Sequence, residues 1–304
     1  MRQVLVTGQG GQLATSLAER LPAHGFAASL AGRPAFDFDR PDSLRQAFAL
    51  HRPEAVVNCA AWTAVDAAEE DEAGAFRANA LGPALLARLC AEAGIPLIQI
   101  GTDYVYDGRK GAPYVETDMP NPLGAYGRTK LAGEWAALAG NPMTVVLRTA
   151  WVFSPVGRNF VKTMLALGAQ RPELRVVADQ HGNPTAAADL ADAIAQVLGR
   201  IGATGWQPGY RGVFHAAPPD STDWHAFALA IFAAAKPGGG PSPVVQAITT
   251  ADYPTRAVRP ADGRLDVSRL REVFGVTLPS WRKGLAQVVM ALQQVPARSV
   301  LGSA

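Results

Sequence analysis

The chain has 304 residues, of which 48% are hydrophobic and 18% are charged, and its net charge is +2. This composition favours about two domains with a sizeable apolar core and, without a long Lys/Arg block, argues against nucleic-acid binding through a basic face. The N-terminal apolar run is too short for a signal-peptide core, and no stretch approaches the ~18 apolar residues that span a bilayer, so we expect a cytoplasmic protein without membrane contact.

Apolar runs alternate with amphipathic segments through the first half of the chain. Strands are expected at 3–8, 27–32, 54–60, 95–103 and 143–153. Helices are expected at 11–25, at 40–53, over 70–94 as one long helix or two, and from 123 onward. This order is typical of an α/β fold with a Rossmann-like, doubly wound parallel sheet covered by helices on both faces. Ligands of such sheets bind at the carboxyl ends of the strands.

After Trp151 the pattern loosens. Helices are expected at 159–170, 186–201 and 223–236, a strand and loop at 174–185, a strand at 211–218, a flexible loop at 236–243 and disorder at 297–304. We therefore expect a dinucleotide-binding domain over 1–150, which the chain rejoins at about 172–198 and 210–217. A smaller α/β substrate-binding domain is expected to be interleaved over 151–304.

A glycine-rich turn joins the first strand to the first helix. Gly8, Gly10 and Gly11 would let backbone N–H groups approach a pyrophosphate closely, and the start of the helix adds a partial positive charge. Strand-to-helix turns also use glycine for geometry alone. The position of this turn, opening the first β-α-β unit, favours a nucleotide site, and we assign Gln12 and Leu13 to it as well.

The second expected strand ends at Gly32 and Arg33, where an acidic residue would bind the 2′-hydroxyl of NAD. An arginine pairs with a 2′-phosphate, which favours NADPH; the alternative is a solvated surface arginine. Asp37 and Phe38 follow, either at the edge of an adenine pocket or as a helix-approach residue and a core aromatic residue.

Tyr126 and Lys130 are four residues apart on the helix that starts near 123, and so share one face. Spacing alone does not make them catalytic. The chain also contains, in this order, the segments TGQGGQLA, VVNCAAWTAVDAAE, GTDYVYDG, YGRTK, LRTAWVF and DQHGNPT. As an ordered set, these segments resemble the extended short-chain dehydrogenase/reductase family and, within it, the dTDP-4-dehydrorhamnose reductases. The chain departs from the usual pattern at three places. Ala14 replaces the third glycine of the first turn, and the acidic residue often found after the second strand is absent. Asp262 and Gly263 stand where Asn and Ser are typical.

The resemblance implies NADPH-dependent reduction of the 4-keto group of dTDP-4-dehydro-β-L-rhamnose to dTDP-L-rhamnose, in a monomer or homodimer. Tyr126 would donate the proton, Lys130 would lower the pKa of Tyr126 and hold the nicotinamide ribose, and the Thr102 hydroxyl would bind the carbonyl oxygen. The other implied contacts are Ala61, Trp62 and Thr63 for the cofactor, and Asp103, Trp151, Asn159 and Arg259 for the nucleotide sugar.

Several alternatives stay open from the sequence. NADH can replace NADPH, and Trp62 and Trp151 can be core residues. Arg259 can belong to a surface ion pair. Mg²⁺ is implied by the resemblance alone, since the five histidines and two cysteines, Cys59 and Cys90, show no ligand spacing.

Rival functions also stay open. Tyr104 stands where related dehydratases carry a catalytic Glu, which argues against water elimination. The remaining rivals are a reductase of another nucleotide-bound keto sugar and a non-catalytic NADP-binding regulatory subunit such as that of methionine adenosyltransferase.

Overall fold

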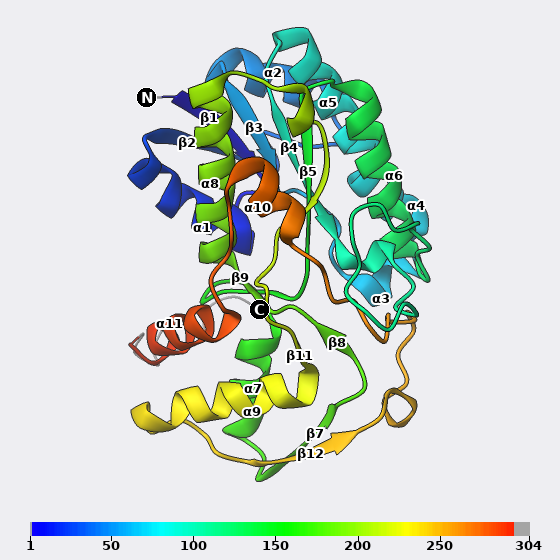
Figure 1. The fold of residues 1–304 in the computed structure, drawn as a ribbon, viewed down its shortest axis with the longest axis vertical. Helices are drawn as coiled ribbons and strands as arrows, with labels where there is room; N and C mark the ends of the chain where they lie inside the picture. The colour runs from blue at the N-terminus through cyan, green and yellow to red at the C-terminus, as the bar shows by residue number, and fades with distance from the viewer. Residues whose placement is uncertain (1, 295–304) are drawn as a thin grey trace.

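A six-stranded parallel sheet forms the larger lobe of the computed structural model, which describes residues 2–294 (Figure 1). Its strands, in spatial order, are β10 (Gly212–His215), β5 (Thr144–Thr149), β4 (Leu97–Thr102), β3 (Ala55–Asn58), β1 (Arg2–Thr7) and β2 (Phe26–Ala31). The expected Rossmann-like fold is confirmed. The strand order reverses between β1 and β3, which places a ligand crevice beyond their carboxyl ends.

Side chains alternate along β1 and so divide the apolar core into two layers. Val4 and Val6 face one layer, whose helices are α1 (Gln12–Arg20), α8 (Ala187–Thr204) and α10 (Ser268–Phe274). Leu5 faces the other layer, whose helices are α2 (Pro41–His51), α5 (Gly82–Ala93) and α6 (Ala125–Gly140). Helices therefore cover both faces of the sheet, as the sequence predicted (Figure 1).

The segment expected as one helix or two is a single helical run with a change of pitch. Its parts are α4 (Glu72–Phe76), the π-helical turn η2 (Arg77–Leu81) and α5, and the short helix α3 (Val65–Ala68) precedes them. Asp71 caps the run, because its carboxylate accepts a hydrogen bond of 2.8 Å from the Gly74 amide. The wider turn lies against α6, where a Cβ on Gly133 would collide with the Asn79 carbonyl oxygen at 1.8 Å.

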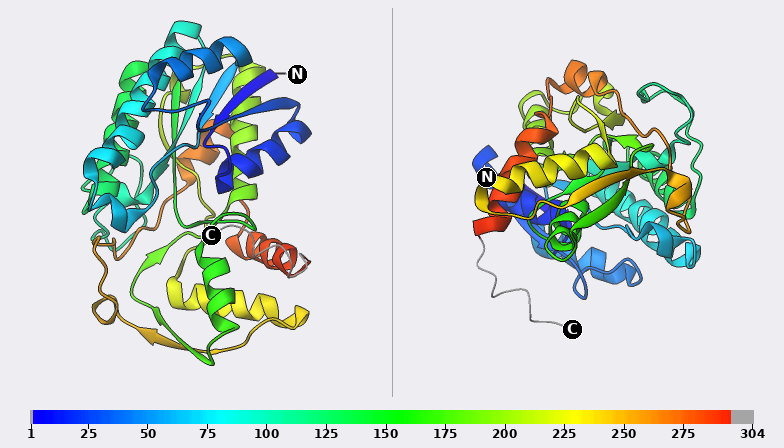
Figure 2. Two further views of the ribbon diagram at one scale, coloured as in Figure 1. Left: turned by 180° about the vertical axis from the view of Figure 1, so that it is seen from behind. Right: turned by 90° about the horizontal axis from the view of Figure 1, so that it is seen from below.

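A smaller lobe lies beyond the carboxyl ends of the strands (Figures 1 and 2). Its apolar cluster joins α7 (Phe160–Gly168), α9 (Trp224–Ala235) and α11 (Trp281–Gln294). Beside them β7 (Glu173–Val177) pairs in parallel with β12 (Val244–Ile248). The expected return of 172–198 to the large sheet is therefore wrong for β7, although α8 does pack in the larger lobe. The second expected return, at 210–217, is β10, which pairs with β5. The sequence reading did not anticipate α10, α11 or β12.

Short elements complete the two lobes and the junction between them. They are β6 (Val152–Phe153) with β9 (Thr185–Ala186), β8 (His181–Gly182) with β11 (Thr222–Asp223), and the 3₁₀ turns η1 (Leu21–His24), η3 (Asp103–Val105), η4 (Pro208–Tyr210), η5 (Lys236–Gly238) and η6 (Thr250–Asp252). The segment 297–304, expected to be disordered, lies outside the described residues. Between residues 2 and 294 no helix is both long and apolar enough to cross a bilayer.

Candidate active site

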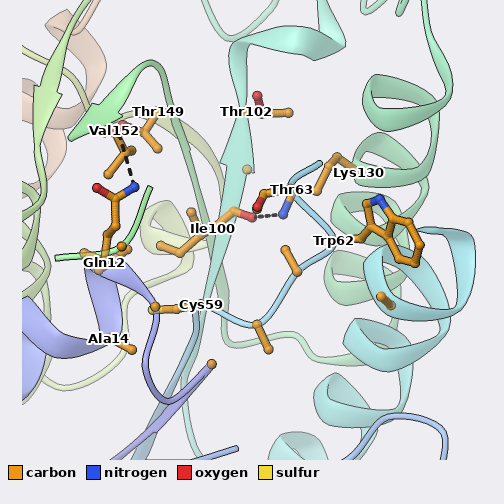
Figure 3. Close-up of a pocket in the computed structure, with 18 of the residues that line it drawn as sticks. Gln12, Ala14, Cys59, Trp62, Thr63, Ile100, Thr102, Lys130, Thr149 and Val152 are labelled. Carbon is orange, nitrogen blue, oxygen red and sulfur yellow. Dashed lines mark hydrogen bonds between the residues drawn. The ribbon is translucent and has the colours of Figure 1, made fainter. Parts of the chain in front are cut away.

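A cavity of about 870 Å³ opens at the carboxyl ends of the strands (Figure 3). The first glycine turn, the ends of β2, β3, β4 and β5, and the start of α6 all contribute to its lining. From the smaller lobe, Trp224 closes one side. This is the crevice that the strand order predicts, and it brings the expected cofactor and catalytic residues into one space.

The glycine turn has the geometry that a diphosphate requires. Gly8 and Gly10 have φ values of +82° and +84°, which favour glycine. A Cβ on Gly8 would lie 2.9 Å from the backbone of Cys59 and Ala60, so β1 and β3 approach closely only with glycine here. Helix α1 begins without a side-chain cap at Gly11, leaving its first N–H groups free to bind an anion. These residues fit a dinucleotide such as NADP.

Arg33 reaches the cavity wall but is already paired. Its guanidinium donates to the carboxylates of Asp37 and Asp39 at 3.1 and 3.0 Å, while the side chain stays 68% exposed. Asp37 forms this ion pair and does not line the cavity, and its assignment to the adenine pocket stays a prediction. Phe38 does line the cavity, and its ring also lies against Gly82, while its place at the edge of an adenine pocket stays a prediction.

Thr102, Tyr126 and Lys130 line the cavity together. Thr102 is the last residue of β4 and Tyr126 lies in the first turn of α6. One turn later, the Lys130 Nζ donates a hydrogen bond of 2.6 Å to the Ile100 carbonyl oxygen, as Figure 3 shows. The Thr102 hydroxyl donates to the Asp103 carboxylate at 3.1 Å. Tyr126 and Lys130 thus lie on one face of α6 toward the cavity, as their spacing of four residues predicts.

The expected lowering of the Tyr126 pKa by Lys130 is wrong for the protein on its own. Burial raises the pKa of Tyr126, and the neighbouring Thr102 hydroxyl only opposes this rise. The Lys130 ammonium is directed to Ile100 instead. Burial lowers the pKa of Lys130 to about 8, against the opposing negative charge of Glu134. At neutral pH the site therefore holds a protonated phenol and a mostly charged amine.

Two expected sugar contacts line the cavity. Burial raises the pKa of Asp103 to about 7. Trp151 has a φ of +48°, a conformation that costs a bulky residue energy and that commonly marks functional sites. Its indole stacks on that of Trp224, with ring centroids 3.5 Å apart and planes 9° apart. No motif pointed to Trp224, because it lies in another lobe and has the pattern of an ordinary core residue of α9.

Two other expected sugar contacts lie outside the cavity lining. Asn159 caps α7 by accepting from the Lys162 amide at 3.1 Å, and its amide nitrogen donates to the Gln12 side chain at 2.9 Å. Arg259 forms an ion pair of 2.9 Å with Asp66, the alternative that the sequence left open, and its other terminal nitrogen is buried with no partner among residues 2–294.

The remaining assigned cofactor residues, Gln12, Leu13, Ala61, Trp62 and Thr63, all line the cavity. The Gln12 amide nitrogen donates to the Val152 carbonyl oxygen at 3.4 Å and so ties α1 to the segment after β5 (Figure 3). Trp62 also packs against the buried alanines of α3, α4 and α6, so its cavity and core interpretations both hold. The segment Asp179 to Thr185, part of the expected strand and loop, contains β8 and the start of β9.

A magnesium site is not supported. Within residues 2–294, no group of three or more His, Cys, Asp or Glu side chains is placed to hold a metal ion. Cys59 and Cys90 are free thiols; Cys90 is buried, while Cys59 lines the cavity.

Comparison with known proteins identifies the family. A family model described as the RmlD substrate binding domain matches residues 1–294. A dTDP-4-dehydrorhamnose reductase of Sinorhizobium fredii is 39% identical over 290 residues, which cover 95% of this chain and 97% of that protein. A probable dTDP-4,6-dihydroxy-2-methyloxan-3-one 4-ketoreductase of Streptomyces antibioticus is 40% identical, with 97% and 98% covered. The crystal structure of a Bacillus anthracis dTDP-4-dehydrorhamnose reductase in complex with NADP has a TM-score of 0.87 at 32% identity, with 96% and 100% covered. This chain therefore belongs to the RmlD family of dTDP-4-dehydrorhamnose reductases.

Proposed function

We propose that this chain reduces the 4-keto group of dTDP-4-dehydro-β-L-rhamnose with NADPH and a proton, giving dTDP-L-rhamnose and NADP⁺. The observation that carries the proposal is the single cavity in which the glycine turn faces Thr102, Tyr126 and Lys130. The larger lobe acts as the dinucleotide domain and the smaller lobe with Trp151 as the substrate domain, in a cytoplasmic monomer or homodimer.

The residues of the cavity supply the proton and the orientation. NADPH, when bound, supplies the hydride. The Tyr126 phenol, kept protonated by burial, donates its proton to the oxygen of the former ketone. The Thr102 hydroxyl stabilises the developing negative charge on that oxygen, and Lys130 holds the ribose through a charge-assisted hydrogen bond. Because burial lowers the pKa of Lys130 to about 8, we expect activity to fall as the pH rises through that value.

Absorbance of NADPH at 340 nm, followed with purified dTDP-4-dehydrorhamnose, tests the proposal directly. Oxidation of NADPH that depends on the sugar supports it. Flat traces with both NADPH and NADH contradict it, and recovery of a methionine adenosyltransferase in a pull-down would then favour the regulatory-subunit rival.

A second candidate is the reduction of a different dTDP-linked keto sugar. It is favoured by Gly263, one of the positions that depart from the family pattern. A Cβ there would lie 2.7 Å from the Asp103 carboxylate, so this departure abuts the cavity. A higher kcat/KM with another dTDP-keto sugar in the same assay would support this candidate.

A further inference from the structure

Helix α6 carries a buried acid one turn beyond Lys130. Tyr126, Lys130 and Glu134 lie at successive turns and face the sheet. Glu134 is 1% exposed, and its Oε2 accepts hydrogen bonds from the Arg148 Nε and Nη2 at 3.0 and 2.7 Å. Arg148 lies on β5, so this buried ion pair fastens the catalytic helix to the strand beside β4.

The other contacts of Arg148 are neutral. Its Nη1 donates to the Tyr106 hydroxyl at 2.7 Å, and the same hydroxyl lies 2.9 Å from the His215 Nε2. Burial lowers the pKa of His215 to about 3, so this imidazole is uncharged at neutral pH. Glu134 is therefore the negative charge that balances Arg148. Arg148 donates to only one of the two Glu134 carboxylate oxygens.

The second oxygen, Glu134 Oε1, is buried without a hydrogen-bond partner among the described residues. A Cβ on Gly101 would lie 2.3 Å from this oxygen, so the carboxylate rests directly against the strand. The neighbouring carbonyl, that of Ile100, accepts the hydrogen bond from Lys130. The unpaired Glu134 oxygen and the Lys130 ammonium thus lie against adjacent residues of β4, Gly101 and Ile100. An unsatisfied buried carboxylate oxygen is costly, which calls for a function that the ion pair alone does not provide.

Few other charges act on Lys130. Cys59, at the end of β3, stays a neutral thiol because burial raises its pKa. Asp103, after β4, is only partly ionised because burial raises its pKa to about 7. Tyr126 is protonated, and Arg148 on β5 pairs with Glu134 through Oε2 alone, which leaves Oε1 unpaired in the part of the chain that the structure describes. Glu134 is the carboxylate that opposes the effect of burial on Lys130.

We propose that Glu134 is a positioning residue for the reductase reaction. Arg148 holds its carboxylate in place, and the missing side chain at Gly101 leaves room for it. The carboxylate keeps the Lys130 amine charged while this amine is hydrogen-bonded to β4, from where it can bind the nicotinamide ribose. This inference rests on the proposed function. Glu134 itself touches neither the sugar nor the cofactor and acts only through Lys130.

The pH profile of kcat/KM for Glu134→Gln tests this role, because the variant keeps the shape and an acceptor for Arg148 but removes the charge. We expect the alkaline limb to move down by about one pH unit, so that activity falls about fivefold at pH 8 and less than about twofold at pH 6. Tyr106→Phe removes a hydrogen bond from Arg148 without changing a charge. It should lower the melting temperature and leave the limb in place.

An unmoved limb in a folded Glu134→Gln variant would overturn the proposal. If that variant does not fold, Gly101→Ala replaces it, since the added Cβ displaces the carboxylate and should shift the limb in the same direction. The fluorescence of bound NADPH, titrated between pH 6 and 9, gives a second readout that needs no turnover. A wild-type protein that binds NADPH with this pH dependence but does not reduce the sugar would contradict the proposed function and leave the role of Glu134 intact.

Discussion

The two lobes contribute to the cavity in different ways. The sheet lobe presents backbone, at the turn of Gly8 and Gly10 and the open start of α1, together with the side chains of Thr102, Tyr126 and Lys130. The smaller lobe presents an aromatic side chain, Trp224, which is supported by further rings of its own cluster. Trp224 lies 4.5 Å from Phe160 between ring centroids.

The difference separates two kinds of binding. Backbone N–H groups at a glycine turn recognise the phosphates common to all dinucleotides, and they depend on local spacing in one short segment. A stacked aromatic wall recognises the shape of one ligand, and it depends on residues that are far apart in the chain. Substitutions in the sheet lobe should therefore affect the cofactor or the chemical step, and those in the smaller lobe should affect the sugar.

The largest effect is expected in the sheet lobe, at Tyr126. Tyr126→Phe removes the proton donor, and we expect kcat to fall by about 10²–10⁴-fold while the Kd of NADPH changes less than about twofold. Stopped-flow absorbance and a fluorescence titration measure the two quantities. Tyr253→Phe, at a residue that is 61% exposed, should match the wild type. Unchanged turnover in Tyr126→Phe would remove this residue from its role.

Gly8→Ala probes the backbone contribution. The added Cβ meets the chain at Cys59 and Ala60, and the positive φ is unfavourable for alanine. Such strain costs about 1–3 kcal/mol, so we expect a lower melting temperature and NADPH binding weakened about tenfold. Gly209→Ala is the matched control, because a Cβ there meets nothing within 4 Å. Equal NADPH affinity in the two variants would show that the turn does not shape the cofactor site.

Trp224→Ala probes the side-chain contribution. Loss of the stack on Trp151 should cost about 0.5–1.5 kcal/mol, which corresponds to a KM for the sugar about two- to tenfold higher. The Kd of NADPH should stay the same. Trp135→Ala, on the 60% exposed Trp135 of α6, controls for the loss of an indole. If Trp224→Ala instead weakened NADPH binding with KM for the sugar unaltered, the contrast between the lobes would fail.

Arg33→Ala is expected to have the smallest effect. The guanidinium is mostly exposed and already shared by Asp37 and Asp39, so its pairing with a 2′-phosphate is worth about 0.2–1 kcal/mol. The KM for NADPH should rise by at most about fivefold, and the KM for NADH should not change. Arg45→Ala, at an exposed arginine paired with Glu92, gives the reference. An equal rise for both coenzymes would exclude a 2′-phosphate contact.

The sequence by itself determined the larger lobe and most of the candidate site. Alternating apolar runs and helix boundaries predicted all six strands of the large sheet and most of their covering helices in chain order, because strand and helix periodicity are local properties. The glycine turn and the pair on α6 were found for the same reason, since each fits within one short segment.

Only the tertiary structure decided the rest. It paired β7 with β12 instead of the large sheet, engaged Arg259 with Asp66, and stacked Trp224 on Trp151. It also placed the Lys130 ammonium on Ile100 and Glu134 against Gly101, which sets the charge state of the site. Partners and pKa values depend on burial and on which distant segments meet, and a local sequence pattern holds no record of either.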